Sequence, residues 1–218
     1  MNHEIIYLYD PLCGWCYGFS PVIRALRDQI GKDIPFTALA GGMVTGERVG
    51  PVGQVAPYIK TAFKRVEDLS GVRFGGKFLE MMETGGATIF DSEPPSRAAY
   101  ILKDAYPDAA IDIAHGVQDI IYKEGQDPNL ATSYHKLASG LGMDTANFDE
   151  HFESHGYRLA IQDEFTLVKR FGVTGFPTVV YRNKEQYYLV SNGFTELEAL
   201  NNALKAIQQE VGKPENPD

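Results

Sequence analysis

The chain has 218 residues, only two of them cysteines, and a formal net charge of −9. A hydrophobic content of 44% with 22% charged residues is ordinary for a globular protein and excludes a disordered chain. Two cysteines are too few for a disulfide-rich secreted scaffold. Because no stretch concentrates Lys and Arg, neither nucleic acid nor an anionic membrane surface is expected as a partner.

The hydropathy of the chain predicts no membrane span. The longest uncharged runs, residues 11–23 and 34–46, have thirteen residues each and contain Gly or Pro. The N-terminal segment has neither the basic residues nor the apolar length of a signal peptide. We therefore expect a cytoplasmic protein. A reducing compartment does not favour a purely structural disulfide, so the two cysteines are expected to have a chemical role.

The first fifty residues have the pattern of a parallel strand–helix–strand unit. Residues 5–9 are a β-branched and aromatic run, typical of a strand buried on both faces. Apolar residues at helical spacing follow, and Gly31 is expected to end that helix in the left-handed conformation. Pro21 lies inside the helical pattern and predicts one kinked helix. A second strand at residues 34–40 completes the nucleus of an α/β fold.

The middle of the chain changes to helical patterns. It begins with a Gly- and Pro-rich loop at residues 41–57, which follows the carboxyl end of a parallel strand and should border a ligand site. No strand is expected between residues 58 and 155, and the apolar spacing predicts helices at residues 56–69, 74–83, 94–105, 108–123, 128–140 and 145–155. This part of the chain is expected to be an all-helical insertion.

The last part of the chain returns to an α/β pattern. The elements expected there are a helix at residues 157–171 ended by Gly172, strands at 178–181 and 187–190 joined by a turn at 183–185, and a helix at 195–211. Thr195 and Glu198 form a capping-box pattern at the start of the last helix.

The motif that carries chemistry is Cys13-Gly14-Trp15-Cys16, which follows the first expected strand and opens the first expected helix. Cysteines three positions apart in a first helical turn lie within disulfide range. The unpaired N–H groups of a helix N-terminus stabilise an anion, so Cys13 should be an exposed nucleophilic thiolate. Cys16 lies deeper and suits the resolving role. The motif therefore predicts a redox-active dithiol.

A structural disulfide and a zinc site account for the cysteines less well. A disulfide across four residues gains little from loop closure. A structural zinc site needs four ligands, and the nearest helical histidine pair, His151 and His155, begins 135 positions after Cys16. We expect that pair on one solvated helix face, and we expect no metal site.

Three stretches of the sequence resemble the DsbA-like branch of the thioredoxin superfamily, and within it the cytosolic group of predicted protein-disulfide isomerases. They are residues 10–16, Pro21 and residues 172–178, and the resemblance extends over essentially the whole chain. It implies an α/β protein with a thioredoxin fold and an inserted all-helical domain. The implied domains are residues 1–50 with the CxxC motif, the helical insertion 51–156, and residues 157–218 with the cis-proline loop.

The resemblance also implies how substrate binds. Pro177 corresponds to the family's cis-proline, which faces the cysteines and exposes the backbone of Phe176 beside Cys13. An extended substrate peptide would pair with that backbone as an added strand. On the residues alone, a trans proline at a strand start remains the alternative. Trp15 joins Phe176 and Pro177 as an expected substrate-binding residue, and the surroundings of the site are expected to include Gly14, Asp10 and Gly175.

The sequence departs from the family at two places. Relatives often have a buried acidic residue six positions before the nucleophile, where this chain has Tyr7, and the nearby Asp10 and Glu4 are not at that spacing. The dipeptide Gly14-Trp15 is neither the Gly-Pro of thioredoxin nor the Pro-His of periplasmic DsbA. Since this dipeptide helps to set the redox potential, the resemblance leaves open whether the protein is an oxidant, a reductant or an isomerase.

These features predict a thiol–disulfide oxidoreductase that acts on protein or peptide thiols and disulfides. We expect no bound cofactor, with glutathione as a candidate co-substrate. One alternative is a glutathione-dependent transferase or isomerase of the kappa or hydroxychromene-carboxylate kind, which typically has serine instead of the cysteine pair. Another is a non-enzymatic peptide-binding module on the same fold.

Overall fold

A four-stranded sheet with the order β2-β1-β5-β6 forms the centre of the thioredoxin-like part. In the computed structural model, which describes residues 3–54, 56–84 and 88–211, strand β1 (His3–Tyr9) pairs parallel with β2 (Phe36–Ala40). On its other edge β1 pairs antiparallel with β5 (Thr178–Asn183), which pairs antiparallel with β6 (Gln186–Asn192).

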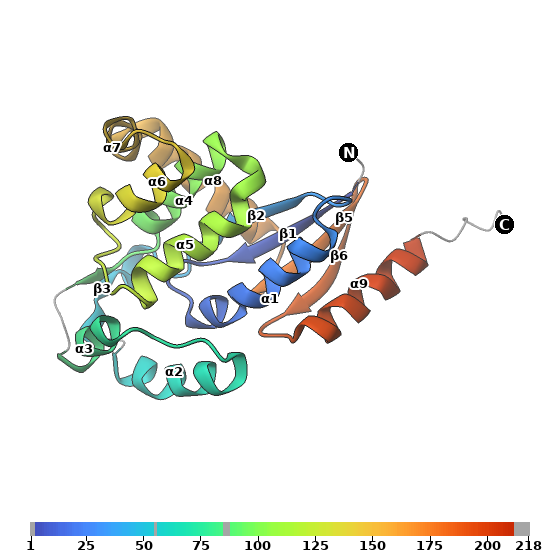
Figure 1. Cartoon of the computed structure of the whole chain (residues 1–218), viewed down its shortest axis with the longest axis horizontal. Coiled ribbons are helices and arrows are strands. Elements are labelled where there is room, and N and C mark those ends of the chain that lie inside the picture. The colour runs from blue at the N-terminus through green and yellow to red at the C-terminus, as the bar shows by residue number, and fades with distance from the viewer. Residues whose placement is uncertain (1–2, 55, 85–87, 212–218) are drawn as a thin grey trace.

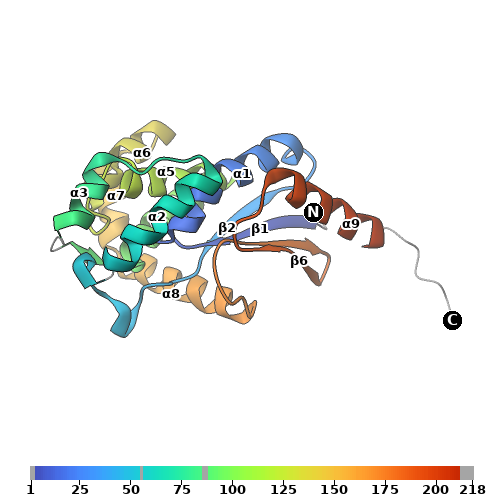
Figure 2. The ribbon, with the colours of Figure 1, turned by 90° about the horizontal axis from the view of Figure 1, so that it is seen from below.

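Helices cover both faces of this sheet (Figure 2). Helices α1 (Gly14–Ile30) and α9 (Leu197–Val211) pack on the face that carries Ile5. Helix α8 (His155–Arg170) supplies Val168 to the opposite face, where it meets Ile6. Because both faces are covered, the residues of β1 from position 5 onward are buried, which explains its continuous apolar run.

The helical insertion lies between β2 and α8 in the sequence, and Figure 1 shows its helices grouped beside one end of the sheet. Its apolar residues form a second core cluster, to which Leu12 and Tyr17 also belong. The insertion contains α2 (Ala56–Ser70), α3 (Gly76–Thr84), α4 (Glu93–Ala105), α5 (Ala110–Tyr122), α6 (His135–Leu141) and α7 (Thr145–Glu153). Helix α5 packs against α1, and α4 packs against α8, so the insertion contacts helices on both sides of the sheet. The fold class is the predicted one, and the domain boundaries at 50 and 156 stay a prediction.

Two expectations about the middle of the chain are wrong. Strand β4 (Ile89–Phe90) lies where no strand was expected, and it pairs antiparallel with β3 (Gly50–Pro51), which lies inside the expected loop. Strands this short have no periodicity to detect. The helix expected at residues 128–140 is helix α6 from position 135, preceded by 3₁₀ residues Ala131–Tyr134. The side chain of Asp127 accepts a hydrogen bond from the N–H of Asn129 at 2.9 Å. This turn holds the backbone out of the helical conformation at residues 127–129, so the helix begins later than expected.

Two expected helix ends also differ. Gly31 has φ −66° and is right-handed, because its N–H donates to the carbonyl of Arg27 and continues the helical pattern by one residue. Helix α9 begins at Leu197 rather than at Thr195, whose hydroxyl donates to the carbonyl of Gly193. Helix α1 runs through Pro21 as one helix, as expected.

Candidate active site

The two cysteines lie where β1 passes into α1. A tight turn precedes them, in which the N–H of Cys13 donates to the carbonyl of Asp10 at 3.0 Å. Cys13 is the N-cap residue of α1, with extended backbone at φ −92° and ψ 107°, and its Sγ accepts the N–H of Cys16 at 3.4 Å. The sulfur thus takes the place of a capping oxygen, at the end of the helix where its dipole favours an anion.

Access to the two thiols is unequal. Both cysteines are free thiols, and Cys13 is 6% exposed whereas Cys16 is fully buried. The deeper position of Cys16 is confirmed, but the expectation of an exposed Cys13 is wrong. Burial, reinforced by the neighbouring Cys13 sulfur, raises the pKa of the Cys16 thiol well above its ordinary value. Cys13 is therefore the sulfur that an external disulfide can reach.

The loop before β5 comes to within contact of Cys13. The peptide bond between Phe176 and Pro177 is cis, and the Cys13 Sγ donates to the carbonyl oxygen of Phe176 at 3.6 Å. In the same loop, the carbonyl of Gly175 accepts the hydroxyl of Thr178 at 2.9 Å. The structure thus brings the expected residues of both motifs together.

Gly41, directly after β2, allows this arrangement. A Cβ at Gly41 would lie 1.9 Å from the Cζ atom of Phe176, so the aromatic ring rests against bare backbone. Any larger residue at this position would displace the ring and the loop that carries it.

Asp10 connects the turn before α1 to two other segments. Its buried carboxylate accepts hydrogen bonds from the N–H of Leu12 at 2.9 Å, the N–H of Met43 at 2.6 Å and the hydroxyl of Ser92 at 2.9 Å. Burial raises the pKa of Asp10 from 3.8 to about 6, although these hydrogen bonds oppose the rise. Sequence reasoning missed Ser92, whose only signal was its place just before an expected helix.

Tyr7, at the position where the resemblance led us to look for an acidic residue, lies beneath Cys16. Its hydroxyl donates to the backbone carbonyl of Cys16 at 3.4 Å, and its ring stacks on Tyr9 with centroids 5.2 Å apart. Burial raises the pKa of Tyr7 well above its ordinary value, so the phenol stays protonated. Tyr7 is thus a neutral hydrogen-bond donor rather than a carboxylate that accepts a proton.

An apolar cavity of about 270 Å³ opens beside Cys13. Leu12 and Trp15 line it from the start of α1, and Phe63 and Val66 line it from α2. None of the described residues that line it is charged. The insertion therefore supplies half of a binding space that the thioredoxin-like part alone would not have.

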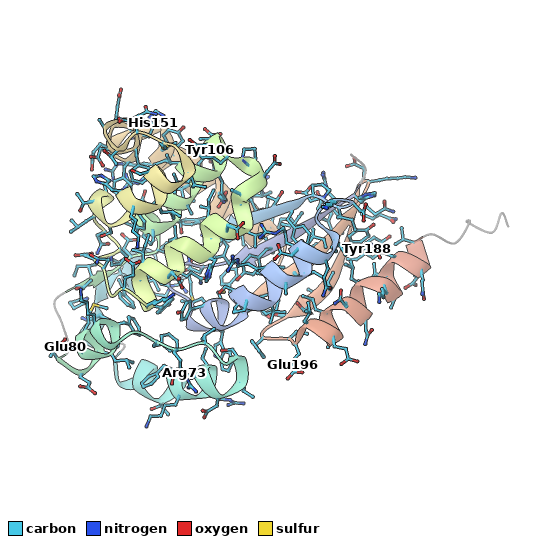
Figure 3. All side chains as sticks on the ribbon, viewed as in Figure 1. Arg73, Glu80, Tyr106, His151, Tyr188 and Glu196 are labelled. Carbon is cyan, nitrogen blue, oxygen red and sulfur yellow. The ribbon has the colours of Figure 1, made fainter. Side chains whose placement is uncertain are left out.

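The histidines of the insertion do not form a metal site. Ser154 ends α7 and caps α8 by accepting the N–H of Gly156, so His151 and His155 lie in different helices and the expected shared face is wrong. His151 stacks on Tyr157, on the far side of the insertion from α2 (Figure 3). Within the described ranges no group of three or more His, Cys, Asp or Glu side chains could hold a metal ion. Within the same ranges no helix is long and apolar enough to cross a bilayer.

Comparison with known proteins identifies the family. Residues 4–205 match the model of the DSBA-like thioredoxin domain, and the chain therefore belongs to that family. It is 26% identical to the cytosolic disulfide reductase DsbM from Pseudomonas aeruginosa, with a TM-score of 0.77 over 95% of this chain and 98% of that chain. A second structure of DsbM, with GSH, matches with a TM-score of 0.75 over the same shares.

Two further proteins are similar over most of the chain. A putative protein disulfide isomerase from Nitrosomonas europaea has the same fold, with a TM-score of 0.84 and 24% identity over 97% of this chain and 100% of that chain. The ClpXP adapter protein SpxH from Halalkalibacterium halodurans is 21% identical over 83% of this chain. The match spans 58% of the length of that curated relative.

Proposed function

We propose that the protein catalyses thiol–disulfide exchange on protein or peptide substrates, with Cys13 as the nucleophile and Cys16 as the resolving thiol. The observation that carries the proposal is the position of the Cys13 sulfur. It caps α1, where an anion is favoured, and it lies 3.6 Å from the Phe176 carbonyl, with Cys16 buried behind it. The presence of both cysteines favours exchange over the glutathione-dependent isomerase alternative.

The exchange proceeds in two steps. The Cys13 thiolate attacks one sulfur of a substrate disulfide, an S–S bond forms between them, and the other substrate sulfur leaves as a thiolate that takes up a proton. Cys16 then loses its proton and attacks Cys13, which releases the second substrate thiol. The substrate gains two electrons and the protein ends with a Cys13–Cys16 disulfide. The reverse sequence oxidises a substrate dithiol.

Substrate binding uses the two surfaces that flank Cys13. The backbone of Phe176 beside Pro177 pairs with an extended substrate segment, which places the substrate sulfur beside Cys13. An apolar side chain next to the substrate cysteine enters the cavity against Trp15. The DsbM structure with GSH supports glutathione as co-substrate, and the cytosolic description of DsbM supports a cytoplasmic location.

The test compares the two cysteine variants on a self-quenched fluorescent peptide that contains one disulfide. Cys13→Ser should lose exchange activity by at least about 1,000-fold, because no sulfur remains to attack. Cys16→Ala should complete the first step and stop, and intact-mass spectrometry should then find a covalent adduct with the substrate. Unchanged turnover by Cys13→Ser would refute the proposal. Adducts with glutathione but never with peptides would favour the glutathione-dependent alternative.

A further inference from the structure

A second hollow, of about 320 Å³, lies at the same end of the sheet as the cysteines. It is bounded by the loop after β2, which supplies Gly41 and Met43, and by the loop before β5, which supplies Thr174 and Phe176. Met43 lines the apolar cavity as well, whose wall includes Cys13. The two hollows therefore share Met43, and Cys13, which lines the first, contacts Phe176, which lines the second.

The second hollow differs from the first in its charge. Arg48 and Lys169 are its only charged lining residues among those described, and both side chains are exposed. Neither makes an ion pair or a side-chain hydrogen bond within the described part of the chain, although the charge of Arg48 favours the ionised form of the buried Asp10. In a protein with a net charge of −9, two exposed cations that make no ion pair among the described residues create a local attraction for anions at this hollow.

We propose that this hollow binds a carboxylate of the substrate, one or two residues from its reactive sulfur. The proposal rests on the exchange reaction proposed above and names the substrate class that the site prefers. A substrate segment paired with the backbone of Phe176 extends along Gly175 and Thr174, and each residue of a strand advances it by about 3.3 Å. A carboxylate one or two residues away would then lie along the hollow that Arg48 and Lys169 line. The planar guanidinium of Arg48 can bind both of its oxygens, while Lys169 adds a point charge.

Two kinds of substrate carry such a carboxylate. In glutathione, the terminal carboxylate belongs to the residue directly after the cysteine. In a protein client, an acidic side chain near the reactive cysteine provides the same group. The chemistry of recognition is the same for both, so the experiment has to separate them.

The first measurement compares kcat/KM for a charged and a neutral disulfide. The variants are Arg48→Gln, Lys169→Gln and their combination, and Lys205→Gln on the exposed face of α9 is the matched control. In the double variant, the ratio of kcat/KM for glutathione disulfide to that for bis(2-hydroxyethyl) disulfide should fall about 10- to 50-fold. The fall should be smaller at high salt, because both cations are exposed. An unchanged ratio for glutathione disulfide and for acidic peptides would overturn the proposal.

A pair of peptide disulfides separates the two sources of the carboxylate. The peptides differ only in Glu or Gln two positions after the cysteine. If the double variant loses its preference for the Glu peptide but not for glutathione disulfide, the site serves acidic protein clients. If the double variant loses its preference for glutathione disulfide but not for the Glu peptide, the site serves glutathione. If it loses both preferences, the site accepts the carboxylate of glutathione and that of acidic protein clients.

A binding measurement keeps the two proposals distinguishable. S-methylglutathione cannot exchange disulfides, and its binding can be followed by the fluorescence of Trp15, the only tryptophan. If the site serves glutathione, the double variant should bind it at least about 10-fold more weakly than wild type. If the wild-type protein turns over bis(2-hydroxyethyl) disulfide but does not prefer disulfides that carry a carboxylate, the subsite is refuted and the exchange reaction is not. If the wild-type protein turns over no disulfide, the proposed exchange reaction is refuted. The binding measurement still tests the subsite in that case: if wild type and double variant bind S-methylglutathione equally, and also bind a reduced Glu peptide equally, the subsite is refuted too.

Discussion

Asp10 and Ser92 are 82 positions apart in the sequence and are joined by a buried hydrogen bond of 2.9 Å. The hydroxyl of Ser92 also accepts the N–H of Val44 at 2.9 Å, so one pair of side chains ties the turn before the cysteines to the loop after β2 and to the start of α4. The insertion is thereby fixed to the thioredoxin-like part directly beneath the site.

Replacement of Asp10 by Asn should change how stability depends on pH. The folded pKa of Asp10, about 6, lies above its ordinary value of 3.8, so the folded protein holds this proton more tightly than the unfolded chain. The resulting stabilisation is fully present below about pH 4 and is lost as the pH rises through 6. As the pH rises between these limits, the free energy of unfolding of wild type should fall by roughly 2–3 kcal/mol relative to that of Asp10→Asn, whose residue 10 side chain does not titrate. Urea unfolding of both proteins across this range measures the difference, and parallel pH profiles would contradict it.

The two thiols should react with iodoacetamide at very different rates. Cys13 reaches the surface and Cys16 does not, so alkylation of Cys16 requires local opening of the first turn of α1. In the reduced native protein we expect Cys13 to react on the order of 100-fold faster, as measured by peptide mass spectrometry. In concentrated urea the two rates should converge, which serves as the control. Equal rates in the native protein would show that Cys16 is not shielded.

Gly41→Ala should displace Phe176, because the new Cβ would lie 1.9 Å from the ring. We expect a loss of about 1–3 kcal/mol in unfolding free energy and slower exchange, since the ring carries the loop next to Cys13. Phe176→Ala removes the obstacle, so Gly41→Ala in that background should cost much less. Gly76→Ala is the control, because nothing lies within 4 Å of a Cβ there. Additive effects of Gly41→Ala and Phe176→Ala would rule out this contact as the cause.

Lys103→Met should destabilise the junction between the insertion and the sheet edge. The ammonium of Lys103 in α4 donates to both carboxylate oxygens of Glu164 in α8 at 3.1 Å and to the carbonyl of Ala38 in β2. Both side chains are at most 10% exposed, so the substitution leaves a buried carboxylate without its cation. The expected loss is about 3–5 kcal/mol by urea unfolding. Lys136→Met, which removes an ion pair at the surface, should cost no more than about 1 kcal/mol, and a similar cost for both would show that burial of the pair is not the cause.

The sequence predicted those parts of the molecule whose signals are local. The buried run at residues 5–9 is the interior of β1, and the helical spacing after Cys13 is α1. That Cys13 and Phe176 lie next to each other was predicted from two motifs of one family. A family resemblance implies a three-dimensional arrangement, which the spacing of residues alone does not.

The parts that sequence reasoning missed depend on tertiary contacts. Ser92 is one of many serines before a helix, and only the folded chain brings it to Asp10. Arg48 ends a short 3₁₀ helix and Lys169 lies on α8, 121 positions later, and neither belongs to a motif. The right-handed conformation of Gly31 depends on the hydrogen bond that its N–H donates to the carbonyl of Arg27 at the end of α1.

The contact between Cys13 and Phe176 spans 163 positions of the chain, which bears on the order of events during synthesis. Strand β1 leaves the ribosome well before its partner β5, which begins only at residue 178. At ordinary translation rates, roughly 10–30 s separate the two strands. Throughout that interval one edge of an apolar strand has no partner, and the dithiol has no loop opposite it. The nascent chain therefore carries two free thiols before the loop that contacts Cys13 has been made.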